Sequence, residues 1–253
     1  MTIIEYHRPQ TIDEALALLA RGQPASLPLA GGTAIDRTTR QPLALIDLQA
    51  LGLDRITRRG NTLEIGAMVT LQSLLDGSVP EALQEVIRLE ATHNLRQVAT
   101  AAGTLVAASG RSPFATALLA LDAVLTVLSG PEQIGLGDLL PLRSERLRGR
   151  LITQVNIPLN ARMAYDYVAR TPADLPIVCA AAATWPSGRT RVALGGFGRA
   201  PTLAFDGAGT DGVEAAARSA YSQAGDEWAS AEYREDIAGV LAARCVGSLQ
   251  VIG

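Results

Sequence analysis

Two short stretches combine glycine and threonine with little side-chain bulk: "LAGGTAID" at 29–36 and "TAAGTLV" at 100–106. Each follows an apolar or strand-like segment. Where no bulky side chain covers the backbone, its N–H groups can point at an anion, and a helix N-terminus adds positive charge. Thr33, Thr100 and Thr104 would each add a hydroxyl donor. The chemistry they suggest is phosphate binding; the alternative is a pair of strand-to-helix turns, which need glycine for conformational reasons.

Neither stretch matches the GxGxxG or GxxxxGK[ST] pattern of nucleotide-binding loops. The rest of the chain offers little for catalysis. There is no GxSxG or HExxH motif, and the carboxylates are scattered rather than paired. His93 lies in a polar segment, which is typical of an exposed or helix-terminal histidine. A reaction carried out here would therefore depend on a bound group.

The cysteines do not indicate a metal or an iron–sulfur cluster. Cys179 and Cys245 are isolated, and the chain has only two histidines, at 7 and 93. Such sites normally take four ligands, often thiolates at close spacing. We expect two buried, inert thiols. If electrons pass through this protein, its own thiols and metals are not the predicted carriers.

Composition limits the class of protein. The chain has 253 residues, of which 48% are apolar and 19% charged, so one large domain or two small ones with a packed core is expected. A net charge of −3 without a block of basic residues argues against nucleic acid as a partner. Apolar stretches fall well short of the ~20 residues of a membrane span. The N-terminus carries charge where a signal peptide has its apolar run, which predicts a cytoplasmic protein.

Local patterns predict the elements that position these stretches. Thr11 and Glu14 fit a capping box at the start of a helix that ends near Gly22. Alternating residues on both sides of 59–61 predict a hairpin, and 101–104 is predicted as a loop of small residues between more apolar runs. The remaining predictions for the N-terminal part are strands at 25–30, 43–48, 123–128 and 151–158, helices at 71–91 (broken near 76–80) and 115–122, a short helix opening at 33–40, and loop and turn at 129–141.

The pattern changes after Pro158. Three strands are predicted at 163–170, 176–185 and 189–198, the last two joined by a turn at 186–188. Two helices follow, at 211–224 and 230–249. We place a boundary near 158–162, between a part that mixes helices with strands and a part with a small sheet followed by helices. The predicted fold class is α+β.

Taken in order, these segments resemble one family. "IIEYHRPQTIDEALALLA", "LPLAGGTAID", "LRQVATAAGTLVAAS" and "ALLALDAVLTVL" are similar to the flavin-binding medium subunit of molybdenum hydroxylases, the xanthine dehydrogenase and carbon monoxide dehydrogenase group. "AYDYVARTPADLPIVCAAA", "RVALGGFGRAP" and "SAEYREDIAGVLAARC" are similar to its C-terminal domain. The resemblance covers nearly the whole chain, and the ordered set is more specific than any single motif.

The resemblance implies a PCMH-like FAD-binding domain at 1–158, with subdomains of about 1–55 and 56–158, and a C-terminal domain at 159–253 with a small antiparallel sheet and helices. In this family the two glycine loops hold the FAD pyrophosphate. Carried over by position, the implied cofactor-binding residues are Ala30, Gly31, Gly32, Thr33, Ala34 and Ile35 in the first loop, Thr100, Ala101, Ala102, Gly103 and Thr104 in the second, and Val106, Ile152 and Asp174 near the flavin.

The sequence departs from the family pattern at three places. Ala102 stands where the second loop usually has a glycine, which would strain the backbone if φ there were positive. Pro113 stands where an aspartate usually binds the cofactor, and proline offers neither a carboxylate nor an N–H. Tyr167 stands where a lysine is common. These changes bear on whether the site is occupied rather than on the fold.

The family resemblance implies a function and partners. The chain would be the FAD-binding subunit of a molybdopterin-dependent oxidoreductase in a hetero-oligomer with a molybdopterin-binding large subunit and a [2Fe–2S] small subunit. FAD would receive electrons from an iron–sulfur cluster and pass them to NAD or another acceptor. Two alternatives remain: a degenerate member that serves as a scaffold or assembly subunit without flavin, and a free-standing flavin reductase.

Overall fold

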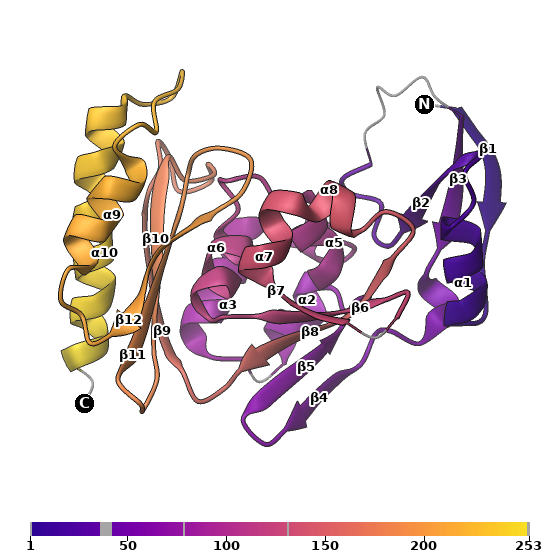
Figure 1. Ribbon diagram of the computed structural model, residues 1–253, viewed down its shortest axis with the longest axis horizontal. Coiled ribbons are helices and arrows are strands. Elements are labelled where there is room, and N and C mark those ends of the chain that lie inside the picture. The colour runs from indigo at the N-terminus through magenta and orange to yellow at the C-terminus, as the bar shows by residue number, and fades with distance from the viewer. Residues whose placement is uncertain (1, 36–41, 78, 131, 252–253) are drawn as a thin grey trace.

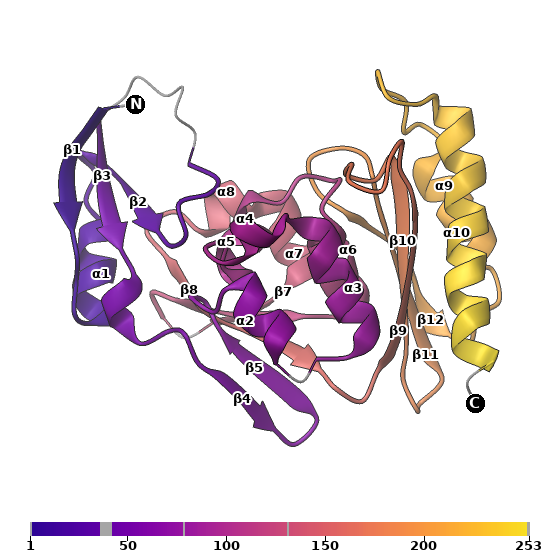
Figure 2. The same cartoon turned by 180° about the vertical axis from the view of Figure 1, so that it is seen from behind.

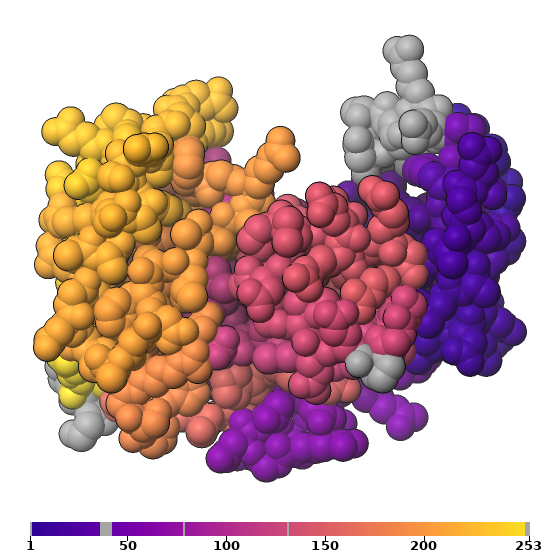
Figure 3. Space-filling model, viewed as in Figure 1, coloured from indigo at the N-terminus to yellow at the C-terminus, as the bar shows by residue number. Residues whose placement is uncertain are grey.

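A computed structural model describes residues 2–35, 42–77, 79–130 and 132–251. Three sheets follow one another along the long axis of the molecule, with helices between and beside them (Figure 1). The space-filling view shows them as successive layers, from the N-terminal indigo part through the magenta and pink centre to the orange and yellow C-terminal part (Figure 3). The α+β fold class is confirmed.

The N-terminal sheet is parallel, in the order β1-β3-β2. Its strands are β1 (Thr2–His7), β2 (Ala25–Leu29) and β3 (Pro42–Asp47), and α1 (Ile12–Leu19) connects the first two. The predicted capping box is present: Thr11 accepts from the N–H of Glu14, whose side chain reaches back to the N-cap backbone. A small core of α1 and β3 residues closes this part, and Leu151 of the central sheet joins it.

The central sheet is antiparallel throughout, in the order β4-β5-β8-β6-β7. Its strands are β4 (Ile56–Arg59), β5 (Thr62–Gly66), β6 (Val124–Leu128), β7 (Glu132–Gly135) and β8 (Leu151–Pro158). The predicted hairpin turn is present, and Gly60 takes the positive φ of 58° that such a turn requires. Alternate side chains such as Leu63 and Ile65 enter the main core, as period-two patterning predicts.

Helices cover the apolar face of the central sheet (Figure 2). They are α2 (Leu71–Asp76), α3 (Glu81–Glu90), α4 (His93–Arg96), α5 (Ala101–Ala107), α6 (Pro113–Ala120), α7 (Leu136–Leu139) and α8 (Arg143–Arg146), with 3₁₀ turns at Gln49–Leu51 and Leu140–Leu142. The break predicted near 76–80 separates α2 from α3. The prediction of loop and turn at 129–141 was wrong, because β7 and α7 lie there; both are only four residues long, too short to show a period. Of the short helix predicted at 33–40, residues 36–40 lie outside the described residues.

The C-terminal sheet is antiparallel, in the order β12-β11-β10-β9. Its strands are β9 (Arg162–Val168), β10 (Val178–Thr184), β11 (Arg189–Gly195) and β12 (Thr202–Ala208), and α9 (Val213–Tyr221) and α10 (Ala231–Val251) cover its outer face. The alanine run in β10 is buried on both faces: Ala180 and Ala182 pack toward these helices, Ala181 and Ala183 toward the main core. The antiparallel C-terminal sheet is confirmed. The edge strands β1 and β12 were not predicted.

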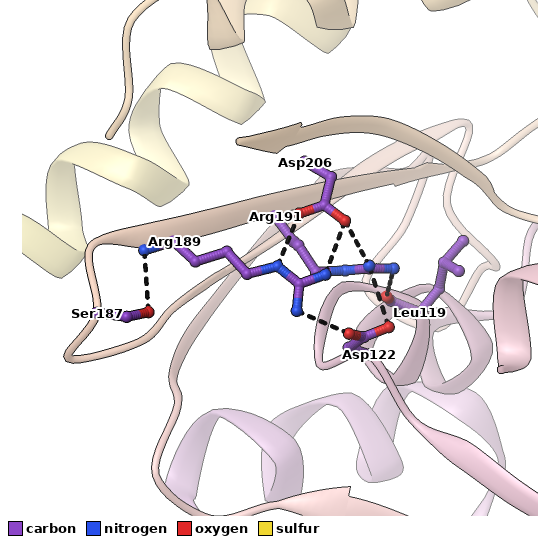
Figure 4. Close-up of polar contacts among 6 residues, drawn as sticks. All are labelled: Leu119, Asp122, Ser187, Arg189, Arg191 and Asp206. Carbon is purple, nitrogen blue, oxygen red and sulfur yellow. Dashed lines mark hydrogen bonds and ion pairs between the residues drawn. The ribbon is translucent and has the colours of Figure 1, made fainter. Parts of the chain in front are cut away.

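The C-terminal sheet is fixed to the central part by packing and by charge. Every residue of α6 is buried, and α6 lies against β10 and β11. Arg191 of β11 is almost fully buried and forms ion pairs with Asp122, at 3.0 Å, and Asp206, at 2.7 Å, while its guanidinium also donates to the Leu119 carbonyl. Arg189 bridges the same two carboxylates at 2.9 and 2.8 Å (Figure 4). This network joins the end of α6 to β11 and β12.

Both cysteines are buried and unpaired, as predicted. Burial raises the pKa of the Cys179 thiol to about 11 and that of Cys245 to about 12, which keeps both protonated and unreactive. Among the described residues, no helix is both long and apolar enough to cross a membrane.

Candidate functional site

The first glycine stretch follows β2 at the edge of the N-terminal sheet. Gly32 has a positive φ of 68°, a conformation that side chains with a Cβ rarely adopt, so glycine is required there by the turn itself. Gly32, Thr33 and Ala34 are exposed, whereas Ala30, Gly31 and Ile35 are half-buried. The exposed part of the stretch presents backbone, the methyl groups of Thr33 and Ala34 and one hydroxyl.

The second stretch is not a loop, which corrects the prediction at this point. Thr100 is the N-cap of α5, and its hydroxyl accepts from the N–H of Gly103 at 3.2 Å. Two backbone hydrogen bonds of 2.8 Å, from the Ala101 N–H to the Val69 carbonyl and from the Leu71 N–H to the Ala99 carbonyl, join the start of α5 to the segment between β5 and α2. Small residues there suggested a loop, but a capping threonine followed by alanines also suits a helix start.

The two stretches, 70 residues apart in sequence, meet in space. A Cβ built on Gly31 would overlap the carbonyl oxygen of Val98, just before α5. A Cβ on Gly103 would lie 3.9 Å from the Cβ of Ala30 and 2.8 Å from the hydroxyl of Thr100. Glycine is therefore needed at 31 because two backbones touch there, and the exposed turn at 32–34 is held beside α5.

The chemistry of these residues fits an anionic group. Among the described residues of the two stretches, 29–35 and 100–106, there is no charged side chain; Asp36, which ends the first stretch, lies outside the described residues. The hydroxyl of Thr33 is exposed and that of Thr104 is half-buried. A pyrophosphate needs N–H and O–H donors with little steric bulk around them, and the residues present supply that.

The departures from the family pattern are accommodated without strain. Ala102 lies within α5, is buried, and is not among the residues with positive φ, so its methyl group packs in the core. Pro113 occupies the first turn of α6, where a proline is well tolerated. The N-terminus of α6 is already satisfied by Ser112, which caps Ala115, and by Glu90, whose carboxylate accepts from the N–H of Phe114 at 2.9 Å and from the Ser112 hydroxyl at 2.8 Å.

Glu90 is a titratable group that inspection of the sequence missed. Its burial, only partly offset by the bonds from Phe114 and Ser112, raises the pKa of the carboxyl to about 7. The residues that face it across the junction with the C-terminal sheet are Tyr165, whose buried hydroxyl has no partner, and the Cys179 thiol. A glutamate at the end of an amphipathic helix gives no sign of burial in the sequence alone.

The other predicted site residues lie at some distance from one another along the fold. Val106 is exposed on α5, and Asp174 is exposed in the 169–177 loop between β9 and β10. Ile152, on β8, is buried in the same core as Ala102. Tyr167 is half-buried on β9, and its ring lies 5.9 Å from that of Tyr165.

Sequence inspection also missed Val98, whose backbone meets Gly31. A backbone contact leaves no signature in residue type. The sequence does show that Leu95 and Val98 are apolar residues in an otherwise polar segment. In the structure both side chains are about half exposed, close to the start of α5. His93 is exposed at the start of α4, in agreement with its interpretation.

Comparison with known proteins gives a consistent result. The family model described as "FAD binding domain in molybdopterin dehydrogenase" matches residues 2–160. The uncharacterized protein YgfM of Escherichia coli K12 is 30% identical over 99% of this chain and 98% of its own length. The carbon monoxide dehydrogenase medium chain of Afipia carboxidovorans is 27% identical over 96% and 95%. The structure of reconstituted CO dehydrogenase from Oligotropha carboxidovorans superimposes with a TM-score of 0.81 over 96% of both chains, at 25% identity.

Proposed function

We propose, since the chain belongs to the family of FAD-binding domains in molybdopterin dehydrogenases, that the junction between the turn at 30–35 and the start of α5 holds the FAD pyrophosphate. FAD is the cofactor of this family, and the chain is an oxidoreductase subunit that works with partner chains. The observation that carries the proposal is the contact of Gly31 with Val98, because it brings two uncharged, glycine-bearing segments to one place.

The proposed roles follow from exposure. The turn formed by Gly32, Thr33 and Ala34 is exposed, and we propose that its backbone N–H groups bind phosphate oxygens, with the hydroxyls of Thr33 and Thr104 as further donors. Thr100 fixes the first turn of α5, while Ala101, Ala102 and Gly103 keep that turn narrow. Ile35 and Val106 offer apolar surface beside the donors. Ile152 is buried in the same core as the start of α5, and for Asp174, exposed in the 169–177 loop, we propose a role near the flavin.

We also propose a path for the electrons and a set of partner chains. FAD, when bound, supplies the redox chemistry, and we infer that its electrons come from a [2Fe–2S] small subunit and go to NAD or another acceptor. A molybdopterin-binding large subunit would complete the hetero-oligomer. We propose the domain division at 1–158 and 159–253, with subdomains of about 1–55 and 56–158. The chain's own task is to bind and orient the cofactor, which agrees with its lack of a paired acid and base.

A charge placed in the proposed phosphate site tests the proposal. Ala34→Glu puts a carboxylate where the pyrophosphate would lie, and Ala34→Gln supplies the same shape without charge. Residue 34 is exposed, so neither change disturbs the core. We expect the glutamate variant to bind FAD at least about tenfold more weakly than the glutamine variant, measured by flavin absorbance and calorimetric titration. Gly32→Val is a poorer test, because the positive φ of Gly32 would strain any such variant.

The same measurements separate the alternatives. Equal FAD affinity of the two variants would mean that the turn at 32–34 is not the phosphate site. A wild-type chain with no flavin absorbance and no heat of FAD binding would support the scaffold role instead. Flavin binding in a chain that is isolated without molybdopterin or iron–sulfur partners would support the free-standing reductase.

A further inference from the structure

An exposed tryptophan lies between two arginines at one end of the C-terminal sheet. Trp228 belongs to the 222–230 loop between α9 and α10 and is 39% exposed. The guanidinium carbon of Arg111 lies 4.4 Å from the centre of its ring, and that of Arg170 lies 4.6 Å from it. Three loops that are distant in sequence therefore converge: 108–112, 169–177 and 222–230. Leu175, also exposed, lies in the second of them.

The loop that carries Trp228 is held rigidly from below. Arg234 is fully buried, and its guanidinium donates to the carbonyls of Ile177, Ala224 and Ala229 and to the carboxylate of Asp226. That carboxylate accepts in turn from the N–H of Trp228, at 2.8 Å, and from that of Ala229. Each nitrogen of the Arg234 guanidinium therefore donates a hydrogen bond to the 222–230 loop or to Ile177, just before β10. The position of Trp228 is consequently fixed before any partner binds.

The arginines on either side have no carboxylate partner. Among the described residues, Arg111 and Arg170 form no salt bridge, although most arginines of the C-terminal part do. Arg111 is oriented instead by the carbonyls of Leu175 and Pro176. Arg199, exposed in the loop after β11, also forms no ion pair with the described residues, and the hydrogen bond from Gly110 to Gly198 brings its loop beside that of Arg111. The nearby acidic side chains in these loops are Asp174, Glu227 and the paired Asp226.

We propose that this surface, the Trp228 rim (Trp228, Leu175, Arg111, Arg170 and Arg199), is the contact surface for a partner protein chain that presents carboxylates. Tryptophan and arginine are the residue types that most often dominate binding at protein interfaces, and a preordered loop lowers the entropic cost of binding. Unpaired guanidiniums favour an acidic partner in a chain whose net charge is −3. The inference rests on the proposed function only in treating the chain as one subunit of a complex; it does not require flavin.

The location of the rim makes it accessible to a large partner. In Figure 1 the loops that carry it stand at the upper end of β10 and α10, beyond the covered faces of the sheet. None of its residues lines the groove between α9 and α10 or the groove beside Trp185. An open, projecting surface of this kind suits a protein chain better than a small ligand.

An unusual feature of the sequence allows a direct test: it contains no lysine, and all 22 basic residues are arginine. Arg170→Lys keeps the charge and introduces the only side-chain amine, which a carbodiimide can join to a carboxylate in contact with it. Arg162→Lys, at the start of β9 and so at the opposite end of the strand that precedes the Arg170 loop, is the control, because Arg162 is also exposed. In the complex isolated from cells that produce this chain with its partners, we expect a cross-link from Lys at 170 to an Asp or Glu of a partner chain, and none from 162.

A second pair of variants measures the contribution to binding. Arg170→Glu and Trp228→Ala should each raise the dissociation constant of the complex at least about tenfold, with the arginine effect shrinking at high salt. Arg162→Glu and Trp185→Ala, the latter at the other tryptophan of the chain, should leave it unchanged. Flavin absorbance should be the same in all four. A cross-link at neither position, or equally at both, or complexes of unaltered affinity, would overturn the inference, whereas lost flavin in the wild type would count against the proposed function alone.

Discussion

The central part meets its two neighbours in opposite ways. Toward the N-terminal sheet it presents backbone and small residues: Gly31 against Val98, Ala30 near Gly103, and a minor core to which the central sheet adds only Leu151 as a fully buried residue. Toward the C-terminal sheet it presents a buried helix, a shared core and the Arg191 network. We call these the N-terminal junction and the C-terminal junction.

The difference indicates where a ligand can be held. At the C-terminal junction side chains fill the space, and the polar groups have partners within the protein: Arg191 binds Asp122 and Asp206, and Glu90 accepts from Ser112 and Phe114. At the N-terminal junction residues 32–34 form a turn that is exposed to solvent and has no bulky side chain. A fold that must admit a cofactor on one side and remain rigid on the other needs this asymmetry, because close packing excludes ligands and backbone-lined surfaces admit them.

The largest effect is expected from breaking the C-terminal junction at Arg191. Arg191→Ala removes the guanidinium that lies between Asp122 and Asp206 and leaves the Leu119 carbonyl without this donor, and we expect a loss of about 3–4 kcal/mol in the free energy of unfolding. Both carboxylates are about one third exposed and stay paired with Arg189, which limits the loss. Chemical denaturation measures it. Arg191→Met restores most of the buried volume and should recover only the packing part of the loss. If Arg191→Ala unfolds like the wild type, the network does not hold the junction.

A pH-dependent effect at the same junction is next in size. The folded-state pKa of Glu90 is about 7, above the value of the unfolded chain, so the neutral carboxyl stabilises the fold below about pH 4.5 and this contribution is lost as the pH rises toward 7. Glu90→Gln keeps an oxygen acceptor for Ser112 and Phe114. We expect it to stabilise the protein at pH 8 by up to about 3 kcal/mol and to change little at pH 4.5.

Glu90 and Asp206 should change the free energy of unfolding in opposite directions as the pH falls. Arg189, through its hydrogen bonds, holds the pKa of Asp206 below its usual value, so that group loses its contribution as the pH falls, the opposite of Glu90. Thermal unfolding of wild type and Glu90→Gln between pH 4.5 and 8 separates the two. A difference between the proteins that grows toward low pH would contradict the burial of an ionisable Glu90.

At the N-terminal junction a single methyl group should act mainly on the cofactor. Gly31→Ala would push the Val98 carbonyl away and separate the turn from α5, so we expect FAD affinity to fall about tenfold or more with a smaller loss of stability. Gly22→Ala, where a Cβ meets nothing within 4 Å, is the control. Calorimetric titration with FAD measures both variants, and equal affinities would show that the backbone contact does not shape the site.

The smallest effect is expected at Ala102. Because this residue is helical and buried, Ala102→Gly relieves no strain and should destabilise the protein by about 1 kcal/mol, with no gain in FAD affinity. The control is Ala107→Gly at the exposed end of the same helix. This variant lowers helix propensity but removes almost no buried apolar surface. Tighter FAD binding by Ala102→Gly would mean that the alanine does hinder the cofactor.

Much of the fold could be predicted from local patterns, since α1, the hairpin at Gly60, β8 and the strands β9 to β11 each have a clear period or capping signal. The failures have physical causes. Edge strands β1 and β12 are largely exposed, so no alternation of buried residues marks them. The start of α5 is composed of small residues that suit a loop and a helix equally, and only its hydrogen bonds to Val69 and Thr100 decide the matter.

By itself the sequence determined the family, through an ordered set of segments, and the residue types at the proposed site: small, uncharged and rich in glycine. Only the tertiary structure decided what those glycines do. Gly32 allows a turn with positive φ, and Gly31 allows two backbones to touch. At position 102 the backbone is helical, so alanine is tolerated and no glycine is needed. The reason is that steric fit between segments 70 residues apart, like the burial of Glu90 or the exposure of Trp228, depends on packing that no local pattern encodes.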